Sequence, residues 1–338
     1  MTYPLLSFDH LLRLTDDTGI LQHARWSVPN PQEGYTLDDN VRAFVVALKG
    51  HACTGRGDLL ELARRYLGFM LYAQRDDGVF RNFADYGRNW LEESGSEDSN
   101  GRALWALGYG AHHAPERGIR EASLWLFDRA KSGIAGLTSP RAVAGAMLGC
   151  AEVHTAGRNV GEMPVMVEHG AHYLAGLYDQ VVIDGWHWFE ASVTYGNATL
   201  SQAMLVAGLL TGSARYLEIG RDSLEFLITL MFSEGKMDVI GQNGWHARGG
   251  PRAVFDQQPI DAACMVEALL VARRICNEPR YGVLATMAME WFYGNNRMGT
   301  SLYDETTGGC FDALILDGVN ANQGAESTLA HLSARMAR

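Results

Sequence analysis

The side chains best suited to chemistry in this sequence are acids and amides in short loops that precede runs of small and branched apolar residues. Six such segments begin at Tyr35, Ser96, Ser139, Thr194, Gln258 and Asn320, and the one at Ser139 is short and lacks a carboxylate. The acids in or beside them are Asp38, Asp39, Glu97, Asp98, Glu190, Asp256, Asp261 and Glu326. When several carboxyl groups face one cavity their pKa values separate, so one can act as a general acid and another as a general base. The pattern therefore predicts acid–base catalysis.

Some of these acids have a purely structural alternative role. Thr36 and Asp39 are three residues apart, which is the spacing of a capping box at the start of a helix. An acid in the first turn also compensates the helix dipole. For Asp38 and Asp39, capping and catalysis both remain open.

Aromatic and amide side chains are concentrated in the same loops. Indole rings offer flat apolar faces to a sugar ring, and amides pair with neighbouring hydroxyl groups. The loop aromatics are Trp90, Trp186, Trp188, Phe189, Tyr195 and Trp245, whereas Trp105, Trp125 and Trp291 lie in helical patterns and are expected in the core. The candidate sugar-binding polar residues are Asp38, Asn40, Asn100, Asn197, Gln242, Asn243, Gln257, Gln258, Asn320, Asn322 and Gln323.

Three histidines, His23, His187 and His246, also lie in these loops. Each could bind substrate or transfer a proton near neutral pH. His169 and His172 are expected on an amphipathic helix rather than at a metal ion, so no metal site is predicted. No nucleotide-binding or H-E-x-x-H motif is present, and we expect no cofactor.

The composition indicates which kinds of molecule the protein binds. The net charge is −11 and Lys49, Lys131 and Lys236 are the only lysines, which argues against a nucleic-acid partner and favours a neutral or cationic ligand. The five cysteines form no C-x-x-C pair, as expected for free thiols in a reducing compartment. The start MTYPLLSFDHLLRL does not resemble a signal peptide, and no apolar run is long enough to span a bilayer. We therefore expect a cytoplasmic protein without a membrane partner.

The hydrophobic pattern predicts the elements that carry these residues. Each opening segment leads into a helix that is small or apolar nearly all round, and an amphipathic helix follows it. Such alternation is typical of stacked helical hairpins. We predict an all-α (α/α)6 toroid in a single domain, residues 1–338, with YPLLSFDHLLRLTDD forming a helix that pairs with the C-terminal helix. Short strands are expected in VVIDGWHWFEAS, FRNFADYGRNWLEESGS and TSLYDETTGGCFDAL.

The segments YTLDDNVRA, EDSNGRALWALG, WHWFEASVTYGNA, FDQQPIDAA and NQGAESTLA resemble a family of bacterial domains fused to, or encoded beside, glycosyltransferases. This resemblance runs from GILQHARWSVPNPQEG to the C-terminus. The hairpin repeat also resembles the six-hairpin glycosidase superfamily, which includes glucoamylase, unsaturated glucuronyl hydrolase and the N-acylglucosamine and cellobiose 2-epimerases. The resemblance implies a toroid fold, a sugar substrate and association with a glycosyltransferase, but no assigned catalytic pair.

The leading hypothesis is an inverting glycoside hydrolase that acts on a neutral oligosaccharide. Glu190, in an aromatic loop that favours the protonated form, is the predicted acid and Glu326 the predicted base. Asp39, Asp98 and Asp261 are the next candidates. One alternative is a sugar epimerase or isomerase that uses His23, His187 or His246. The other is a non-catalytic glycan-binding domain that serves a glycosyltransferase.

Overall fold

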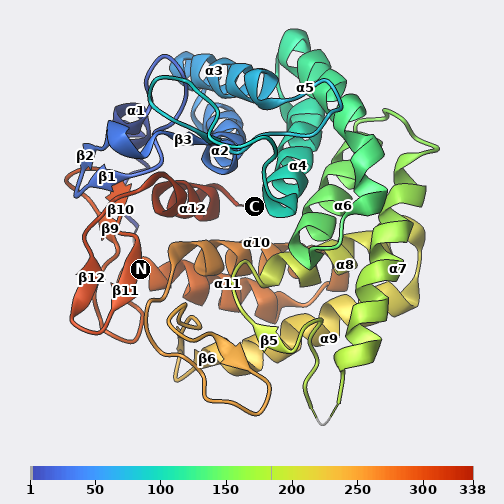
Figure 1. The fold of residues 1–338 in the computed structure, drawn as a ribbon. Coiled ribbons are helices and arrows are strands. Elements are labelled where there is room, and N and C mark those ends of the chain that lie inside the picture. The colour runs from blue at the N-terminus through green and yellow to red at the C-terminus, as the bar shows by residue number, and fades with distance from the viewer. Residues whose placement is uncertain (1–2, 184, 338) are drawn as a thin grey trace. The chain divides into compact units, whose positions relative to one another are not determined.

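The computed structural model describes residues 3–183 and 185–337, and twelve α-helices lie within them (Figure 1). Six helices, which we call the opening helices, follow or overlap the six segments named above. They are α2 (Leu37–Thr54), α4 (Glu97–His113), α6 (Pro140–Thr155), α8 (Ala198–Thr211), α10 (Pro259–Cys276) and α12 (Ala325–Met336). The others are α1 (Asp9–Leu14), α3 (Gly57–Ala73), α5 (Arg117–Ala130), α7 (Met163–Val181), α9 (Ala214–Met231) and α11 (Pro279–Trp291). The predicted alternation of helices is confirmed.

The strands are two or three residues long and lie in the loops. They are β1 (Ala24–Arg25), β2 (Val28–Pro29), β3 (Tyr35–Thr36), β4 (Phe83–Ala84), β5 (Ser192–Val193), β6 (Phe232–Ser233), β7 (Lys236–Met237), β8 (His246–Ala247), β9 (Tyr303–Asp304), β10 (Gly309–Cys310), β11 (Ala313–Ile315) and β12 (Gly318–Asn320). Two 3-10 turns span Pro31–Glu33 and Lys131–Gly136. Of the three segments expected to hold strands, FRNFADYGRNWLEESGS contains β4 and TSLYDETTGGCFDAL contains β9 and β10, whereas VVIDGWHWFEAS reaches only the first residue of β5.

The chain divides into two compact units. The N-terminal unit contains residues 12–24 and 28–171, and the C-terminal unit contains residues 3–11, 25–27 and 172–337 apart from residue 184. The prediction of a single domain stays a prediction.

In the N-terminal unit, α2 packs against α3 and α4, and α4 packs against α5 and α6. Glycines let α4 and α6 approach each other closely (Figure 1). A Cβ atom on Gly108 would lie 2.3 Å from the carbonyl oxygen of Gly149, and one on Gly101 would lie 2.4 Å from the Cα of Ala142. The small residues of these opening segments therefore allow backbone-to-backbone packing.

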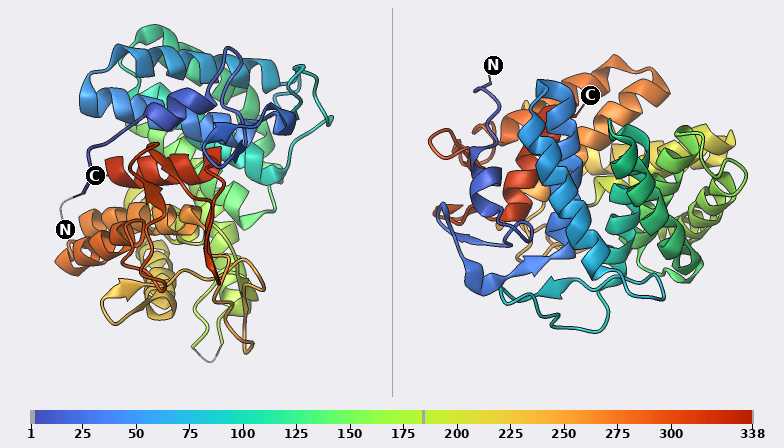
Figure 2. Two further views of the ribbon diagram at one scale, coloured as in Figure 1. Left: turned by 90° about the vertical axis from the view of Figure 1, so that its left-hand side faces the viewer. Right: turned by 90° about the horizontal axis from the view of Figure 1, so that it is seen from above.

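Side-chain caps fix where these helices begin. Thr36 accepts a hydrogen bond from the backbone N–H of Asp39, and Ser96 and Ser139 make the same kind of contact at α4 and α6. β3 pairs with β4 immediately before α2. In the right-hand view of Figure 2 the cyan segment that carries β4 lies beyond the ends of α2 and α3. The acidic loops of this unit thus lie at the N-terminal ends of its opening helices.

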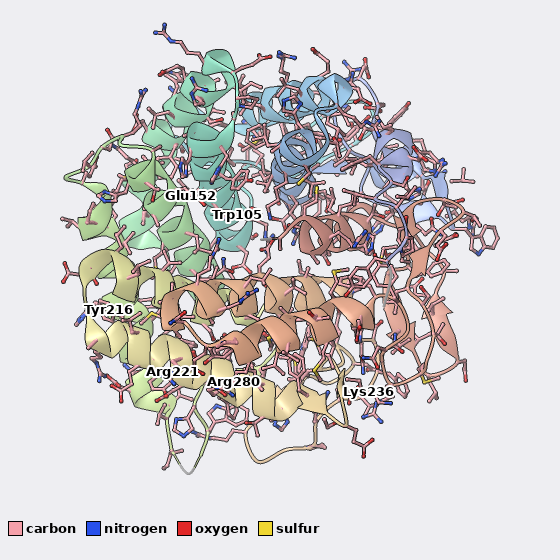
Figure 3. The ribbon with its side chains drawn as sticks, turned by 180° about the vertical axis from the view of Figure 1, so that it is seen from behind. Trp105, Glu152, Tyr216, Arg221, Lys236 and Arg280 are labelled. Atoms are coloured by element: carbon pink, nitrogen blue, oxygen red, sulfur yellow. The ribbon has the colours of Figure 1, made fainter. Side chains whose placement is uncertain are left out.

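In the C-terminal unit, α8 packs against α9 and α10, and α10 packs against α11 and α12. Ion pairs join α9 to the start of α11: Arg221 lies 2.5 Å from Glu278, and Arg280 pairs with Glu225. Both arginines are labelled in Figure 3. These pairs are partly exposed, so each contributes little to the free energy of unfolding.

Two expectations about the helices need correction. The N-terminal helix, α1, has only six residues, because Asp16 ends it by accepting a hydrogen bond from the backbone N–H of Thr18 at 2.8 Å. Trp291 is buried as predicted, but Trp125 is 53% exposed and lies under the guanidinium of Arg129 instead of in the core. The N-terminal segment does contact the C-terminal region, since Arg335 donates to the carbonyl oxygen of Pro4 at 2.8 Å.

Candidate active site

The N-terminal unit contains an acid cluster made of Asp38, Asp39, Glu97 and Asp98, with Arg102 beside it. Asp38, in the first turn of α2, forms an ion pair with Arg102 of α4. Burial alone would raise the pKa of the Asp38 carboxyl, but the positive charges of Arg102 and Arg42 outweigh burial and hold this pKa below its ordinary value. Its Oδ1 atom is buried and has no hydrogen-bond partner among the described residues. Asp38 is therefore held as a carboxylate.

Asp39 and Asn40 form hydrogen bonds that stabilise the first turn of α2. The Asp39 carboxylate accepts from the Thr36 hydroxyl at 2.6 Å, and the Thr36 hydroxyl accepts from the backbone N–H of Asp39 at 3.0 Å. The Asn40 amide donates to the carbonyl of Thr36 and accepts from the N–H of Ile20. Both side chains are buried. Asp39 therefore caps the helix and also lies 3.6 Å from Arg42, while the expectation that Asn40 binds sugar is corrected, because its buried amide bonds to the backbone at both ends.

Glu97, Asp98 and Asn100 connect the start of α4 to neighbouring loops. Glu97 accepts hydrogen bonds from the backbone N–H groups of Thr138 and Ser139, and Asp98 accepts from the Ser139 hydroxyl. Asn100 accepts from the N–H of Phe80 at 2.8 Å. These contacts hold α4 and α6 in register. They also give the polar groups of this loop partners within the protein.

Two other candidates of the N-terminal unit are Trp90 and His23, and both are partly exposed. The Trp90 ring packs against Phe69 and Tyr72, with centroid distances of 5.7 and 4.8 Å. The Trp90 indole therefore belongs to an aromatic group at the base of the β4 loop.

In the C-terminal unit, Asp261 and Asn197 form a buried pair between α10 and the start of α8. The Asn197 amide donates to Asp261 at 3.2 Å and to the carbonyl oxygen of Thr194 at 2.8 Å. Asp261 is 5% exposed and Asn197 is 1% exposed. The pair joins two helices, and little of either side chain reaches the surface.

The loop tryptophans do not all present faces to solvent. Trp188 is completely buried and Trp186 is 6% exposed, with its indole N–H donating to the carbonyl of Glu190 at 2.8 Å. The expectation that these two rings bind sugar is corrected, because the loop folds its apolar side chains inward. Trp245 is partly exposed, lies 6.1 Å from the Tyr195 ring and has a positive φ of 56°. Trp245 and Tyr195 remain the aromatic candidates of this unit.

Two amide side chains that were predicted to bind sugar are also buried in the protein interior. Gln257 is fully buried, donates to Asp238 at 2.7 Å and accepts from the Trp291 indole at 3.1 Å. Gln323 is 2% exposed and donates to Asp304 at 2.9 Å. Both positions are corrected to structural roles, since hydrogen bonds to the protein use both ends of each amide. Gln258 and Asn322 are partly exposed.

A cavity of about 820 Å³ lies between the loop of residues 241–258 and the hairpin formed by β11 and β12. We call it the loop–hairpin cavity. Its lining residues are Gln242, Asn243, Phe255, Asp256, Ile315, Leu316, Asp317, Val319, Asn320 and Ala321. The backbone of Gln257 pairs with that of Leu314 and so joins the loop to the hairpin. Burial raises the pKa of the Asp256 carboxyl above its ordinary value. The cavity therefore combines a carboxylic acid, amides and apolar surface.

The predicted catalytic pair, Glu190 and Glu326, belongs to this same unit, and both side chains are partly exposed. Beside Glu326, Asp312 accepts hydrogen bonds from the N–H of Gly324, the hydroxyl of Ser327 and the amide of Asn322. Asp312 thereby fixes the start of α12. Sequence reasoning missed it because Asp312 precedes a hairpin and lies outside every helix-opening segment.

Two of the loop histidines lie in the C-terminal unit. The Nδ1 atom of His246, in β8, is buried without a hydrogen-bond partner among the described residues, and its ring lies 5.4 Å from that of Trp186. His187 is hydrogen-bonded to the Tyr178 hydroxyl at 3.1 Å. The Nδ1 atom is thus hydrogen-bonded in His187 and has no partner among the described residues in His246.

No protein-family model matches this sequence, and no curated protein matches it. Many solved structures do match. A D-mannose isomerase is 14% identical with a TM-score of 0.75, covering 99% of this chain and 98% of its own. A sugar epimerase from a ruminal bacterium is 12% identical with a TM-score of 0.74, covering 98% and 93%. An inactive variant of an α-1,6-mannanase from a Salegentibacter species, solved with α-1,6-mannotriose, is 13% identical with a TM-score of 0.65, covering 97% and 95%.

At these identities the likeness establishes the fold and leaves the activity open. The predicted fold class, an all-α (α/α)6 toroid, is confirmed. Among the described residues, no helix has the length and apolar character that crossing a membrane requires.

Proposed function

We propose that this chain is a carbohydrate-active enzyme that hydrolyses a glycosidic bond in a neutral oligosaccharide. The observation that carries the proposal is the loop–hairpin cavity. Its volume of about 820 Å³ suits a small oligosaccharide, and its amides, at Gln242, Asn243 and Asn320, suit sugar hydroxyl groups. Asp256 adds a carboxyl group whose raised pKa favours the protonated form that a general acid needs.

The proposed chemistry is an inverting displacement. One carboxylic acid protonates the leaving oxygen while one carboxylate removes a proton from a water molecule on the opposite face of the sugar, which requires roughly 6.5–9.5 Å between the two groups. Glu326 is the proposed base. There are two proposed acids. Glu190 lies in the aromatic loop, and Asp256 lines the loop–hairpin cavity. Only one of them can protonate a given leaving group.

The similar solved structures support a sugar substrate. They include a mannanase solved with a mannotriose and isomerases or epimerases that act on sugars. Association with a glycosyltransferase and a cytoplasmic location stay predictions.

The test begins with a product screen of mannose-, glucose- and galactose-based oligosaccharides, followed by NMR of the anomer released. Glu326→Gln should lower kcat by about 10²–10⁴-fold, because it removes the base while preserving shape. One of Glu190→Gln and Asp256→Asn should cause a comparable loss. Glu305→Gln, which changes an exposed acid of the same unit, is the matched control and should be neutral.

The acid can be distinguished from the base by its leaving-group dependence. A nitrophenyl glycoside expels a stable anion that needs no protonation, so the variant that lacks the acid should recover much of its rate on this substrate. The Glu326→Gln variant should not recover. If all three variants cleave oligosaccharides at wild-type rates, the proposed roles are wrong.

A second candidate function is sugar epimerisation or isomerisation, favoured by the partly exposed imidazole of His246 in its aromatic loop and by the similar sugar isomerase and epimerase structures. A histidine that removes a proton from an opened sugar should exchange that proton with solvent. Deuterium uptake from D2O by mannose, glucose or cellobiose, abolished in His246→Asn and retained in Glu326→Gln, would replace the hydrolase proposal. Tight oligosaccharide binding without any product would instead indicate a glycan-binding domain.

A further inference from the structure

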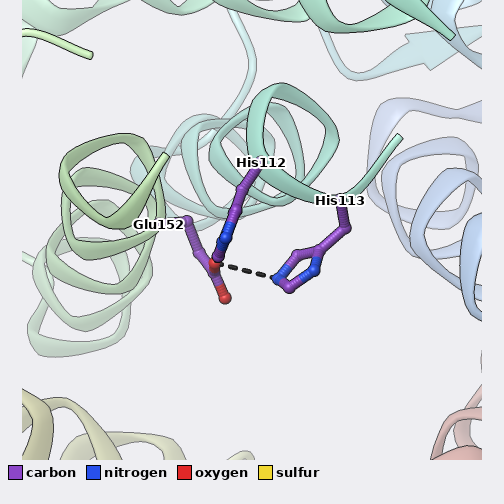
Figure 4. A group of neighbouring side chains, drawn as sticks. All are labelled: His112, His113 and Glu152. Atoms are coloured by element: carbon purple, nitrogen blue, oxygen red, sulfur yellow. Dashed lines mark hydrogen bonds and ion pairs between the residues drawn. The ribbon is translucent and has the colours of Figure 1, made fainter. Parts of the chain in front are cut away.

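A compact group of metal-ligating side chains lies in the N-terminal unit, apart from the residues of the acid cluster. His112 and His113 end α4, and Glu152 faces them from α6 (Figure 4). One carboxylate oxygen, Oε2 of Glu152, lies 2.6 Å from Nδ1 of His112 and 3.0 Å from Nε2 of His113. These three atoms lie within 4.8 Å of one another. Two imidazoles and one carboxylate thus converge on one point.

The packing of the two helices holds these side chains in place. Gly108 and Gly149 lie one turn before the ligands, and their backbones are in contact, so α4 and α6 pack closely beside the cluster. The imidazole rings of His112 and His113 have centroids 4.0 Å apart, and the Tyr109 ring lies 4.3 Å from His113. Ligands carried by two packed helices and oriented by ring contacts form a pre-organised site.

The cluster is also accessible. The His112, His113 and Glu152 side chains are 27%, 39% and 29% exposed. His112 lines a cavity of about 400 Å³. Two arginines line the same cavity: Arg158 pairs there with Glu121 at 2.7 Å, and Arg120 donates to the carbonyl of Ala114 at 2.9 Å. An ion can therefore enter, and water can occupy a further coordination position.

The ligand spacing requires only a small adjustment. Tetrahedral zinc with bonds of about 2.0–2.1 Å places neighbouring ligand atoms roughly 3.3 Å apart. The observed separations from Glu152 are 2.6 and 3.0 Å, and the two imidazole nitrogens lie within 4.8 Å of each other, so side-chain movements of about 1–2 Å would form the site. The ion would replace the protons that now bridge each imidazole nitrogen to the carboxylate.

We propose that His112, His113 and Glu152 bind a divalent transition-metal ion, with Zn²⁺ as the reference ion and water completing its coordination. Two histidines and one carboxylate are a common ligand set for zinc and related first-row ions. The proposal departs from the sequence-based expectation that no metal is bound. It does not depend on the proposed hydrolase activity, because none of its residues belongs to the proposed active site.

The experiment uses the full chain in a Cys53→Ser background, which removes an exposed thiol that could bind zinc by itself. After treatment with a chelator, Zn²⁺ and Co²⁺ are added in competition with a chromophoric chelator. We expect one equivalent to bind, the Co²⁺ protein to show the visible bands of a four-coordinate site, and the melting temperature to rise with Zn²⁺.

His112→Asn, His113→Asn and Glu152→Gln should each weaken binding by at least about 10–100-fold, the range found when even an outer-shell partner is lost. His169→Asn on α7 is the matched control and should bind as the parent does. Circular dichroism checks that each variant is folded. The proposal is overturned if the parent binds no equivalent of Zn²⁺, or if folded ligand variants bind as tightly as the parent; the cluster would then be an ion pair only.

Discussion

Asp38 and Asp39 are neighbours in the sequence, yet their carboxyl groups have different partners. Asp39 is bonded to the Thr36 hydroxyl at the start of its own helix, whereas Asp38 reaches Arg102 on the next opening helix. Asp261 and Gln257, which the sequence also suggested as site residues, likewise form hydrogen bonds within the protein. Burial and internal hydrogen bonds therefore exclude several of the residues that the sequence suggested for catalysis or sugar binding.

His331 provides a prediction at this scale. It is 2% exposed, its Nε2 is hydrogen-bonded to the Tyr293 hydroxyl at 2.7 Å, and its buried Nδ1 has no partner among the described residues. Burial, with a smaller contribution from the positive charge of Arg335, lowers the pKa of His331 from 6.5 to about 3. The folded state therefore binds this proton more weakly than the unfolded state does.

Because the folded pKa is the lower one, the stability contributed by neutral His331 is complete above pH 6.5 and decreases as the pH falls toward 3. The free energy of unfolding should be about 2 kcal/mol lower at pH ~5 than at pH ~7.5 through this residue. Urea denaturation at both pH values measures it. His331→Gln should show a pH difference smaller by that amount, and an unchanged difference would contradict the assignment.

At the scale of elements, close helix packing depends on glycines that the sequence pattern shows only as small residues. A Cβ atom on Gly149 of α6 would lie 2.3 Å from the carbonyl oxygen of Leu104 on α4 and 2.7 Å from its carbonyl carbon. Both are backbone atoms of a buried helix, so neither can move without shifting α4. The same packing brings His112, His113 and Glu152 together.

We therefore predict that Gly149→Ala lowers the free energy of unfolding by about 1–3 kcal/mol, since overpacking outweighs the gain in helix propensity. The matched control is Gly68→Ala in α3, where an added Cβ meets nothing within 4 Å. That variant should be more stable than the parent by about 0.5–1 kcal/mol. Urea denaturation of both variants checks the prediction, and a neutral Gly149→Ala would show that the helices can separate.

At the scale of the whole molecule, the net charge of −11 acts on any charged ligand. If the proposed function is correct, an oligosaccharide that carries carboxylates or sulfates should bind more weakly than its neutral counterpart. Added salt should reduce this difference in affinity, because screening reduces repulsion between exposed charges. Titration calorimetry at low and high salt measures this. Tighter binding of the acidic sugar would point to a local cationic site that outweighs the net charge.

The helices and their order were predictable because hydrophobic periodicity is a local property. The exceptions have local or packing causes. α1 is short because Asp16 turns the chain, and Trp125 is exposed although its helix is amphipathic. Trp186 and Trp188 were expected to bind sugar, but their loop folds inward, and nothing in the spacing of an aromatic loop indicates which way its rings point.

The sequence by itself determined the alternating helices of the described residues, the strands β4, β9 and β10 and the (α/α)6 class, since these depend on periodicity, capping residues and turn residues that act over a few positions. Only the tertiary structure decided which acids and amides form hydrogen bonds within the protein and are therefore not free to bind a ligand. It also placed Asp256 in a cavity and joined His112 and His113 to a glutamate forty residues away. These juxtapositions depend on side-chain burial and on contacts between helices distant in the chain, which no local pattern encodes.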